Sequence, residues 1–140
     1  MFRQFVDELV FQTRGRGFLM ITDTICDVVR SSGIQTGLLS LHLKHTSASL
    51  LIQENADPDV RSDLETFFSR LAPDGDRAFV HIMEGPDDMP AHVRTALTSV
   101  NLNLPVMNAR PALGTWQGIY IWEHRKVSHR RRLALHLMGE

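Results

Sequence analysis

The clearest hydrophobic pattern in the chain is a period of two over residues 36–45. Leu39, Leu41 and Leu43 alternate with polar residues, which predicts a strand with one apolar and one polar face. By the same parity, His45 continues the leucine face. Shorter segments of similar character predict further strands at residues 2–11, 18–21, 48–54, 79–83, 100–106, 112–115, 118–124 and 131–138.

Three segments have helical spacing instead: residues 23–33, 57–71 and 87–97. In the second, Asp57 is a favoured N-cap, and Pro58 stands at the first helical position, where its missing N–H is not needed. Because helices and strands do not alternate regularly, a doubly wound parallel sheet is not expected. The pattern predicts one α+β domain over residues 1–140, with about eight short strands in mixed or antiparallel sheets and about three helices.

Composition narrows the classes of function. The 140 residues are 43% hydrophobic and 22% charged, and the formal net charge of −1 gives no field that attracts nucleic acid or anionic membrane. No segment approaches the roughly 20 apolar residues of a membrane span, and the N-terminus lacks the pattern of a signal peptide. The single cysteine, Cys26, excludes an intrachain disulfide and is interpreted as a small buried hydrophobic residue. We therefore expect a cytoplasmic protein without nucleic-acid or membrane partners.

Seven histidines make imidazole the most prominent candidate chemistry. His45 ends the first strand described above, His81 lies in another predicted strand, and His92 follows Asp88 by four residues near a helix start. That spacing puts Asp88 and His92 on one helix face, where the carboxylate can orient the imidazole. Imidazoles and carboxylates bind zinc and other divalent cations, but this spacing matches no short zinc signature, so structural and surface histidines are the alternative. Surface or sheet-edge positions are expected for His42, His124, His129 and His136.

Two further pairs of residues are candidates for substrate binding. Glu54 and Asn55 precede the helix cap at Asp57 and are not explained by capping, so they can hold a polar substrate. Trp116 and Gln117 lie between two glycines, where the indole can stack on a flat ring and the amide can bond to its edge. A bulged strand with the tryptophan in the core is the alternative.

A basic run over residues 129–132 adds a possible phosphate contact. A strand places Arg131 on the face opposite Arg130 and Arg132, and one of these faces can meet phosphate. A solvated edge strand protected by its charges is the alternative.

Four motifs, in order along the chain, resemble the YjbQ-like family, whose members are described as secondary thiamine-phosphate synthases. The motifs are His45–Leu50, Glu54–Arg61, His81–Val93 and Leu113–Tyr120. The resemblance runs from Phe5 to the arginine-rich C-terminal segment. Residues 123–129 are more basic than the turn of the Phe-Asp-Gly-Pro type associated with the family.

The resemblance implies a fold of orthogonally packed antiparallel sheets and a homotrimer. It also implies a weak, secondary thiamine-phosphate synthase. In this reaction, hydroxymethylpyrimidine diphosphate is joined to hydroxyethylthiazole phosphate, and pyrophosphate is released. The family motifs place a metal-binding histidine cluster at His45, His81 and His92. Magnesium would suit the leaving pyrophosphate and zinc would suit the imidazoles, so a divalent metal is expected and no organic cofactor.

The expected substrate is a small phosphorylated compound, and individual residues are assigned roles in binding and converting it. Catalytic roles are expected for His45, Glu54 and Asp88, and substrate contacts for Thr46, Asn55, Trp116, Gln117 and Arg131. Two alternatives stay open: a metal-dependent hydrolase of a small phosphorylated metabolite, and a non-catalytic trimer that binds a metal or metabolite.

Overall fold

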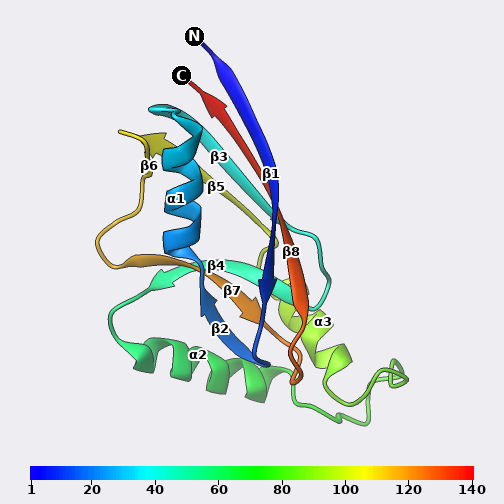
Figure 1. Cartoon of the computed structure of the whole chain (residues 1–140). Coiled ribbons are helices and arrows are strands. Elements are labelled where there is room, and N and C mark those ends of the chain that lie inside the picture. The colour runs from blue at the N-terminus through cyan, green and yellow to red at the C-terminus, as the bar shows by residue number, and fades with distance from the viewer.

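Eight strands and three helices form the computed structural model, which describes all 140 residues (Figure 1). In chain order the elements are β1 (Arg3–Gln12), β2 (Gly17–Met20), α1 (Thr22–Ser32), β3 (Thr36–Leu43), β4 (Ala48–Glu54), α2 (Pro58–Leu71), α3 (Asp88–Leu97), β5 (Asn101–Met107), β6 (Arg110–Pro111), β7 (Gln117–Glu123) and β8 (Arg130–Gly139). Every strand pairing is antiparallel. The predicted α+β fold is therefore confirmed, with antiparallel sheets rather than mixed ones.

The larger sheet has five strands in the order β1-β8-β3-β5-β6. β1 and β8 pair along their whole lengths, so the two chain termini lie side by side (Figure 1). The predicted leucine face of β3 is confirmed, because Leu39, Leu41 and Leu43 are all buried. Their cross-strand partners in β8 are Leu137, Leu135 and Leu133.

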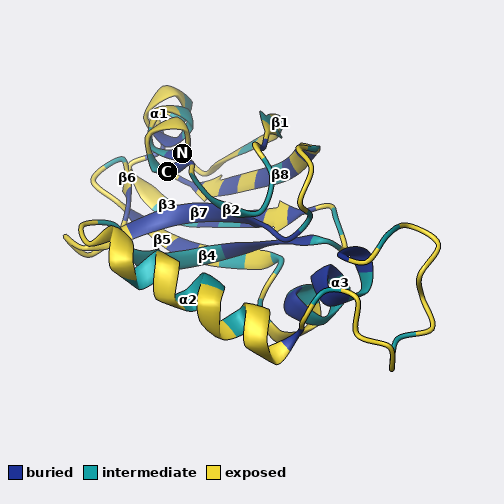
Figure 2. Cartoon of the chain, turned by 90° about the horizontal axis from the view of Figure 1, so that it is seen from below, coloured by how far each residue is buried: buried dark blue, intermediate teal, exposed yellow.

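The smaller sheet, in the order β2-β7-β4, runs across the direction of the larger one (Figure 1). One cluster of 16 buried hydrophobic residues joins both sheets with Ile25 and Val29 of α1. β7 is the central strand of the smaller sheet and is buried over residues 118–123 (Figure 2). β7 is thus paired with a strand on each side and leads into the turn after Glu123.

Local sequence signals fix the ends of the helices. Gly33 ends α1 with φ of 75°, a left-handed conformation that glycine adopts without strain. Asp57 caps α2 by accepting the backbone N–H two residues on at 2.9 Å, and Pro58 follows as predicted. α2 covers the outer side of the smaller sheet (Figure 2). There, Phe68 meets the ring of Trp122 edge to face, with centroids 4.9 Å apart. No helix has the length and apolar character that a membrane crossing requires.

Two predicted strands are wrong. Residues 79–83 belong to an exposed loop between α2 and α3, because no other segment pairs with them. Val80 and Ile82 alternate as in a strand, but alternation without a neighbouring strand does not satisfy the backbone. Residues 112–115 do not continue β6, which is limited to Arg110–Pro111.

Cys26 is partly rather than fully buried on α1. Burial raises the pKa of its thiol, and the neighbouring carboxylate of Asp23 acts in the same direction. The thiol therefore stays protonated at neutral pH and is not a reactive thiolate.

Candidate metal centre

Three side chains that can hold a metal ion meet beside α3: His81, Asp88 and His92. Nε2 of His81 lies 2.6 Å from Oδ2 of Asp88, and Nε2 of His92 lies 3.1 Å from the same oxygen. One donor atom from each residue lies within 4.8 Å of the other two. Two imidazoles and a carboxylate thus converge on one point.

The helix and the preceding loop position these groups. Asp88 is the first residue of α3 and His92 follows one turn later, so the predicted shared face is confirmed. His81 comes from the exposed loop. The Asp88 side chain is 3% exposed, whereas those of His81 and His92 are 42% and 33% exposed. The carboxylate therefore forms the base of the centre, and the imidazoles form its solvent side.

His92 is held in one tautomer by a backbone carbonyl. Its Nδ1 lies 3.0 Å from the carbonyl oxygen of Thr46, which can only accept, so Nδ1 carries the proton. In the neutral ring, the lone pair of Nε2 then faces the anionic oxygen of Asp88 at 3.1 Å. Two acceptors at this distance repel each other. Either a second proton on His92 or a cation among the three donor atoms removes the conflict.

Asp88 has the protonation state that a metal ligand needs. Burial alone would raise the pKa of Asp88, but the hydrogen bond from His81 and the charge of Arg125 act against it, and the pKa is lowered. The carboxylate is therefore ionised at neutral pH. Carboxylate oxygen and neutral imidazole nitrogen together are a common donor set for zinc and related ions.

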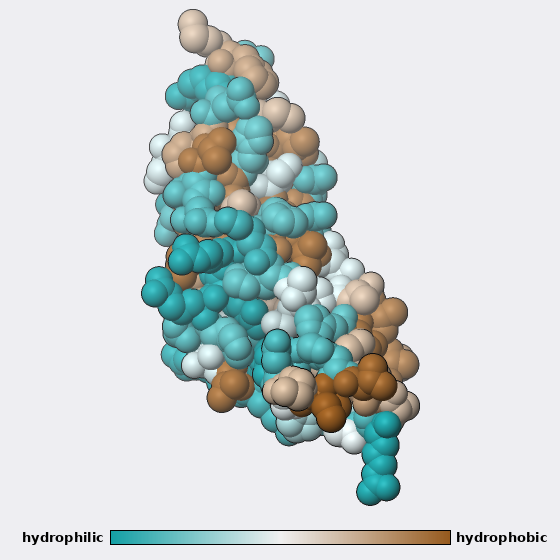
Figure 3. Space-filling model, turned by 90° about the vertical axis from the view of Figure 1, so that its right-hand side faces the viewer, coloured by the Kyte–Doolittle hydropathy of each residue, from teal (hydrophilic) through white to brown (hydrophobic).

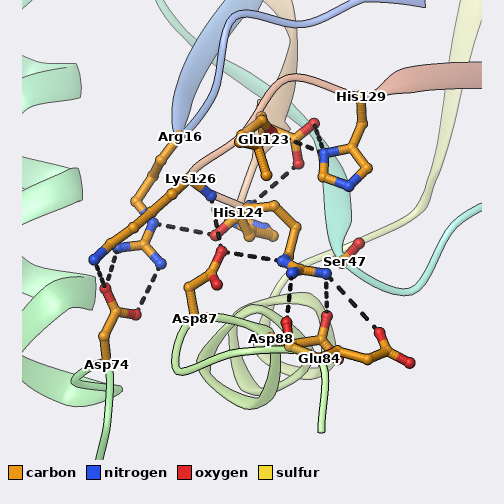
Figure 4. Close-up of polar contacts among 12 residues, drawn as sticks. Arg16, Ser47, Asp74, Glu84, Asp87, Asp88, Glu123, His124, Lys126 and His129 are labelled. Carbon is orange, nitrogen blue, oxygen red and sulfur yellow. Dashed lines mark hydrogen bonds and ion pairs between the residues drawn. The ribbon is translucent and has the colours of Figure 1, made fainter.

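Arg125, from the turn between β7 and β8, closes the buried side of the centre. Its guanidinium donates to Oδ1 of Asp88 at 2.7 Å, to Oδ2 of Asp87 at 3.0 Å and to the carbonyl of Glu84 at 2.9 Å. In Figure 4, Asp87, Asp88 and Glu84 lie together below the turn that carries Lys126. Burial alone would raise the pKa of Asp87, but the Lys126 N–H and the Arg125 charge lower it.

The expected three-histidine cluster is not formed within the chain, because His45 is not part of the converging group. Nε2 of His45 accepts the backbone N–H of Arg132 at 2.7 Å. Burial and the charge of Arg131 lower the pKa of His45, so its ring is neutral. The next residue, Thr46, is exposed and contributes its carbonyl to His92.

Arg131, expected to meet substrate phosphate, is buried instead, with a side chain 3% exposed. Its guanidinium pairs with Glu123, where Nε donates to Oε1 at 2.9 Å, and it also donates to the Ser47 carbonyl and hydroxyl at 3.1 Å. Arg130 and Arg132 are exposed on the opposite face, as the strand parity predicts. Arg131 is thus engaged in structure and not free for a phosphate.

The remaining candidates lie at the other end of the smaller sheet. Ala48 pairs with Glu123 near the centre, whereas Glu54 pairs with Gln117 six residues further on. At about 3.3 Å per residue the two ends are about 20 Å apart. Glu54 accepts the Asp57 N–H at 3.1 Å and Gln117 accepts the Gly114 N–H at 2.8 Å.

Asn55 and Trp116 complete that second end. The Asn55 backbone N–H donates to the Trp116 carbonyl at 3.0 Å. The Trp116 side chain is 64% exposed, so it is not the core residue of the alternative interpretation. Within one chain these four residues do not meet the metal centre.

Sequence reasoning missed two residues near the centre. His124, expected near the surface, is fully buried, and its Nε2 lies 2.8 Å from the Ser49 hydroxyl. Burial lowers the pKa of His124 to about 2. Arg125 was overlooked because its acidic partners lie 37 and 38 residues away in the sequence. The unusual basic character of residues 123–129 was the available signal.

Comparison with known proteins gives consistent matches. The sequence pattern of the family described as "UPF0047 protein YjbQ-like" matches residues 7–140. A UPF0047 protein of Synechocystis is 49% identical over 139 residues, covering 99% of this chain and 95% of that protein. The UPF0047 protein YjbQ of Salmonella typhimurium is 46% identical, covering 94% and 96%.

Solved structures agree in fold. A conserved hypothetical protein of Thermus thermophilus superposes with a TM-score of 0.83 at 32% identity, covering 92% of this chain and 97% of that one. A protein of unknown function from Sulfolobus solfataricus superposes with a TM-score of 0.89 over the full length of both chains, and at 21% identity it supports the fold alone. With the sequence matches, these similarities show that the chain belongs to the YjbQ-like family, UPF0047.

Proposed function

We propose that the chain binds one divalent transition-metal ion of the zinc type through His81, Asp88 and His92. The observation that carries this proposal is the convergence of two imidazoles and a buried carboxylate, with one donor atom from each within 4.8 Å of the other two. A cation among these three donor atoms is attracted by the Asp88 carboxylate and can bind the imidazole nitrogens. Three protein donors leave a position open, as catalytic zinc sites do and structural ones do not.

The chemistry that fits this arrangement is metal-assisted hydrolysis of a small phosphorylated metabolite. A bound zinc-type ion supplies Lewis acidity toward a phosphoryl oxygen and lowers the pKa of water. The chain's contribution is to hold Asp88 ionised at the buried base and to keep His92 in the Nδ1–H tautomer. The partly exposed imidazoles of His81 and His92 leave the donor atoms within reach of a small substrate.

Thiamine-phosphate synthase activity is a second proposal, supported by one observation. The exposed Trp116 ring is free to stack on a pyrimidine. The reaction also needs cations for the leaving pyrophosphate, but Arg125 and Arg131 are already paired with carboxylates. Pyrophosphate release from the two synthase substrates, lost in Trp116→Ala, would favour this activity over hydrolysis.

The loop that carries His81 supports the expected homotrimer as a further proposal. Val80, Ile82 and Met83 are 94%, 66% and 93% exposed beside this ligand. Apolar side chains grouped on a protruding loop are typical of an interface, and a head-to-tail contact between identical chains can close into a ring. Figure 3 shows hydrophobic surface gathered at the lower end of the molecule, on the side where this loop protrudes. Light scattering on a Val80→Asp, Met83→Asp variant should report a smaller particle than wild type.

The metal proposal is tested by the zinc content of purified protein after zinc loading and dialysis. We expect about one ion per chain in wild type and none in His92→Ala or Asp88→Asn. His136→Ala is the matched control, since His136 lies exposed on β8 and contacts Gln4. Zinc retained equally by all four proteins would reject the site. Zinc bound without turnover of any phosphorylated compound would favour the non-catalytic alternative over hydrolysis.

A further inference from the structure

We propose that Arg125 is a positioning residue that presents a single oxygen of Asp88 to the cation and thereby makes the centre select a zinc-type ion over calcium. This inference rests on the proposed metal site. It concerns which ion the site accepts.

The guanidinium is fixed by three acceptors, one for each of its nitrogens. Nη1 bonds to Asp88, Nε to Asp87, and Nη2 to the carbonyl of Glu84, at 2.7, 3.0 and 2.9 Å. The Arg125 side chain is 13% exposed, and those of Asp87 and Asp88 are 9% and 3% exposed. Because all three nitrogens of the planar guanidinium are hydrogen-bonded and the group has little access to water, it is held in one orientation.

The backbone around Arg125 is fixed as well. The Arg125 N–H donates to Oε2 of Glu123 at 3.2 Å, and the Lys126 N–H donates to Oδ2 of Asp87 at 2.9 Å. Glu123 belongs to the buried central strand β7. The turn after β7 is thus docked onto the N-terminal end of α3, and the arginine approaches Asp88 from a rigid base.

The consequence for Asp88 is that its two oxygens have separate tasks. Oδ1 is taken by Arg125, whereas Oδ2 faces Nε2 of both His81 and His92. The carboxylate can therefore bind a cation with one oxygen only. Calcium takes six to eight oxygen ligands and often binds a carboxylate through both oxygens, while zinc accepts one carboxylate oxygen beside imidazoles.

The charge of Arg125 and the geometry of its guanidinium affect metal binding in different ways, and one substitution separates the two effects. The positive charge of Arg125 repels any divalent cation to a similar degree, so it lowers affinity without changing selectivity. Arg125→Lys keeps this charge but replaces the fork by a single nitrogen, which cannot bind Asp87, Asp88 and the Glu84 carbonyl in the same geometry. A change in selectivity in this variant reports on geometry.

The experiment compares zinc binding in wild type, Arg125→Lys, His92→Ala and Arg130→Lys, using a chromophoric chelator as competitor and calcium as displacing ion. Arg130 is the matched control because it is exposed on β8. Residues that orient a metal ligand typically contribute about 10- to 100-fold in affinity. We expect Arg125→Lys to bind zinc about tenfold more weakly and to release it at about tenfold less calcium, with Arg130→Lys unchanged.

Two results would overturn different parts of the account. If Arg125→Lys matches Arg130→Lys in both measurements while His92→Ala loses zinc, the metal site stands and the positioning role of Arg125 falls. If His92→Ala binds zinc as wild type does, the metal site itself falls. Should Arg125→Lys fail to fold by circular dichroism, Asp87→Asn replaces it, because loss of that carboxylate loosens the same fork and should shift both measurements in the same direction by a smaller factor.

Discussion

The two ends of the smaller sheet carry polar residues for different reasons. At the end near α3, Asp88 is buried and two imidazoles converge on one of its oxygens. At the other end, Glu54 and Gln117 each accept a backbone N–H within three residues of themselves. The first arrangement leaves donor atoms directed at a common point, whereas the second satisfies itself locally. Convergence of side chains from distant segments, rather than polarity alone, is what marks the candidate centre.

The largest effect on the free energy of unfolding is expected from breaking the buried ion pair of Arg131 and Glu123. Arg131→Ala leaves Glu123 buried, with a side chain 1% exposed and without its partner, and should lower the free energy of unfolding by about 3–5 kcal/mol in urea denaturation. The exposed neighbour Arg130→Ala should change it by less than about 0.5 kcal/mol. Equal stability of the two variants would contradict the structural role of Arg131 and restore the expected substrate contact.

The next largest effect is a dependence of folding stability on pH, which originates at His124. His124 has a pKa of about 2 in the folded protein, below the ordinary value of 6.5. The unfolded chain therefore takes up a proton that the folded chain does not, and stability falls as the pH drops below 6.5. The slope is about 1.4 kcal/mol per pH unit, which gives about 2–3 kcal/mol lost by about pH 4.5.

A matched variant isolates this contribution. His124→Gln cannot titrate, so urea denaturation between about pH 6.5 and 4.5 should show a shallower slope than in wild type. The comparison also removes the contribution of His45, whose pKa is lowered in both proteins. Identical slopes would mean that His124 is accessible to protons and not buried in neutral form.

A smaller effect is expected at the far end of the sheet. Glu54→Ala removes the acceptor for the Asp57 N–H before α2 and should lower stability by about 1 kcal/mol. Glu54→Gln keeps an acceptor oxygen and should recover most of this loss in thermal denaturation. Loss of enzymatic turnover in Glu54→Gln at wild-type stability would instead support the catalytic role expected from the sequence.

The smallest effect is expected from Trp116→Ala. The side chain is 64% exposed, so stability should change by less than about 0.5 kcal/mol, and zinc affinity by isothermal titration should not change. A clear fall in zinc affinity would show that the two ends meet in the assembled protein, with Trp116 of one chain beside the centre of another.

Much of the fold was predictable because its signals are local. The alternating leucines of β3, the cap at Asp57 and the left-handed Gly33 each depend on residues close in sequence. The prediction failed at residues 79–83, where Val80 and Ile82 alternate but no strand pairs with them. Strand pairing depends on distant segments, and one segment's pattern does not contain that information.

The candidate site was predictable in part for the same reason. Asp88 and His92 were placed together correctly because four residues separate them on one helix. The position of Arg125 and the burial of His124 depend on the packing of β7 against other elements. His45 was predicted to end a strand on its apolar face, but β3 ends at Leu43, and His45 lies beyond it and accepts the backbone N–H of Arg132. The alternation of residues in a strand predicts which face of the sheet a side chain lies on, but not which residue it contacts there.

The most direct test of the account is a crystal structure of the zinc-loaded protein with anomalous scattering recorded at the zinc edge. We expect one anomalous peak per chain, within bonding distance of Nε2 of His81, Nε2 of His92 and Oδ2 of Asp88. A peak elsewhere on the chain, or no peak at these three atoms, would contradict the proposed metal site.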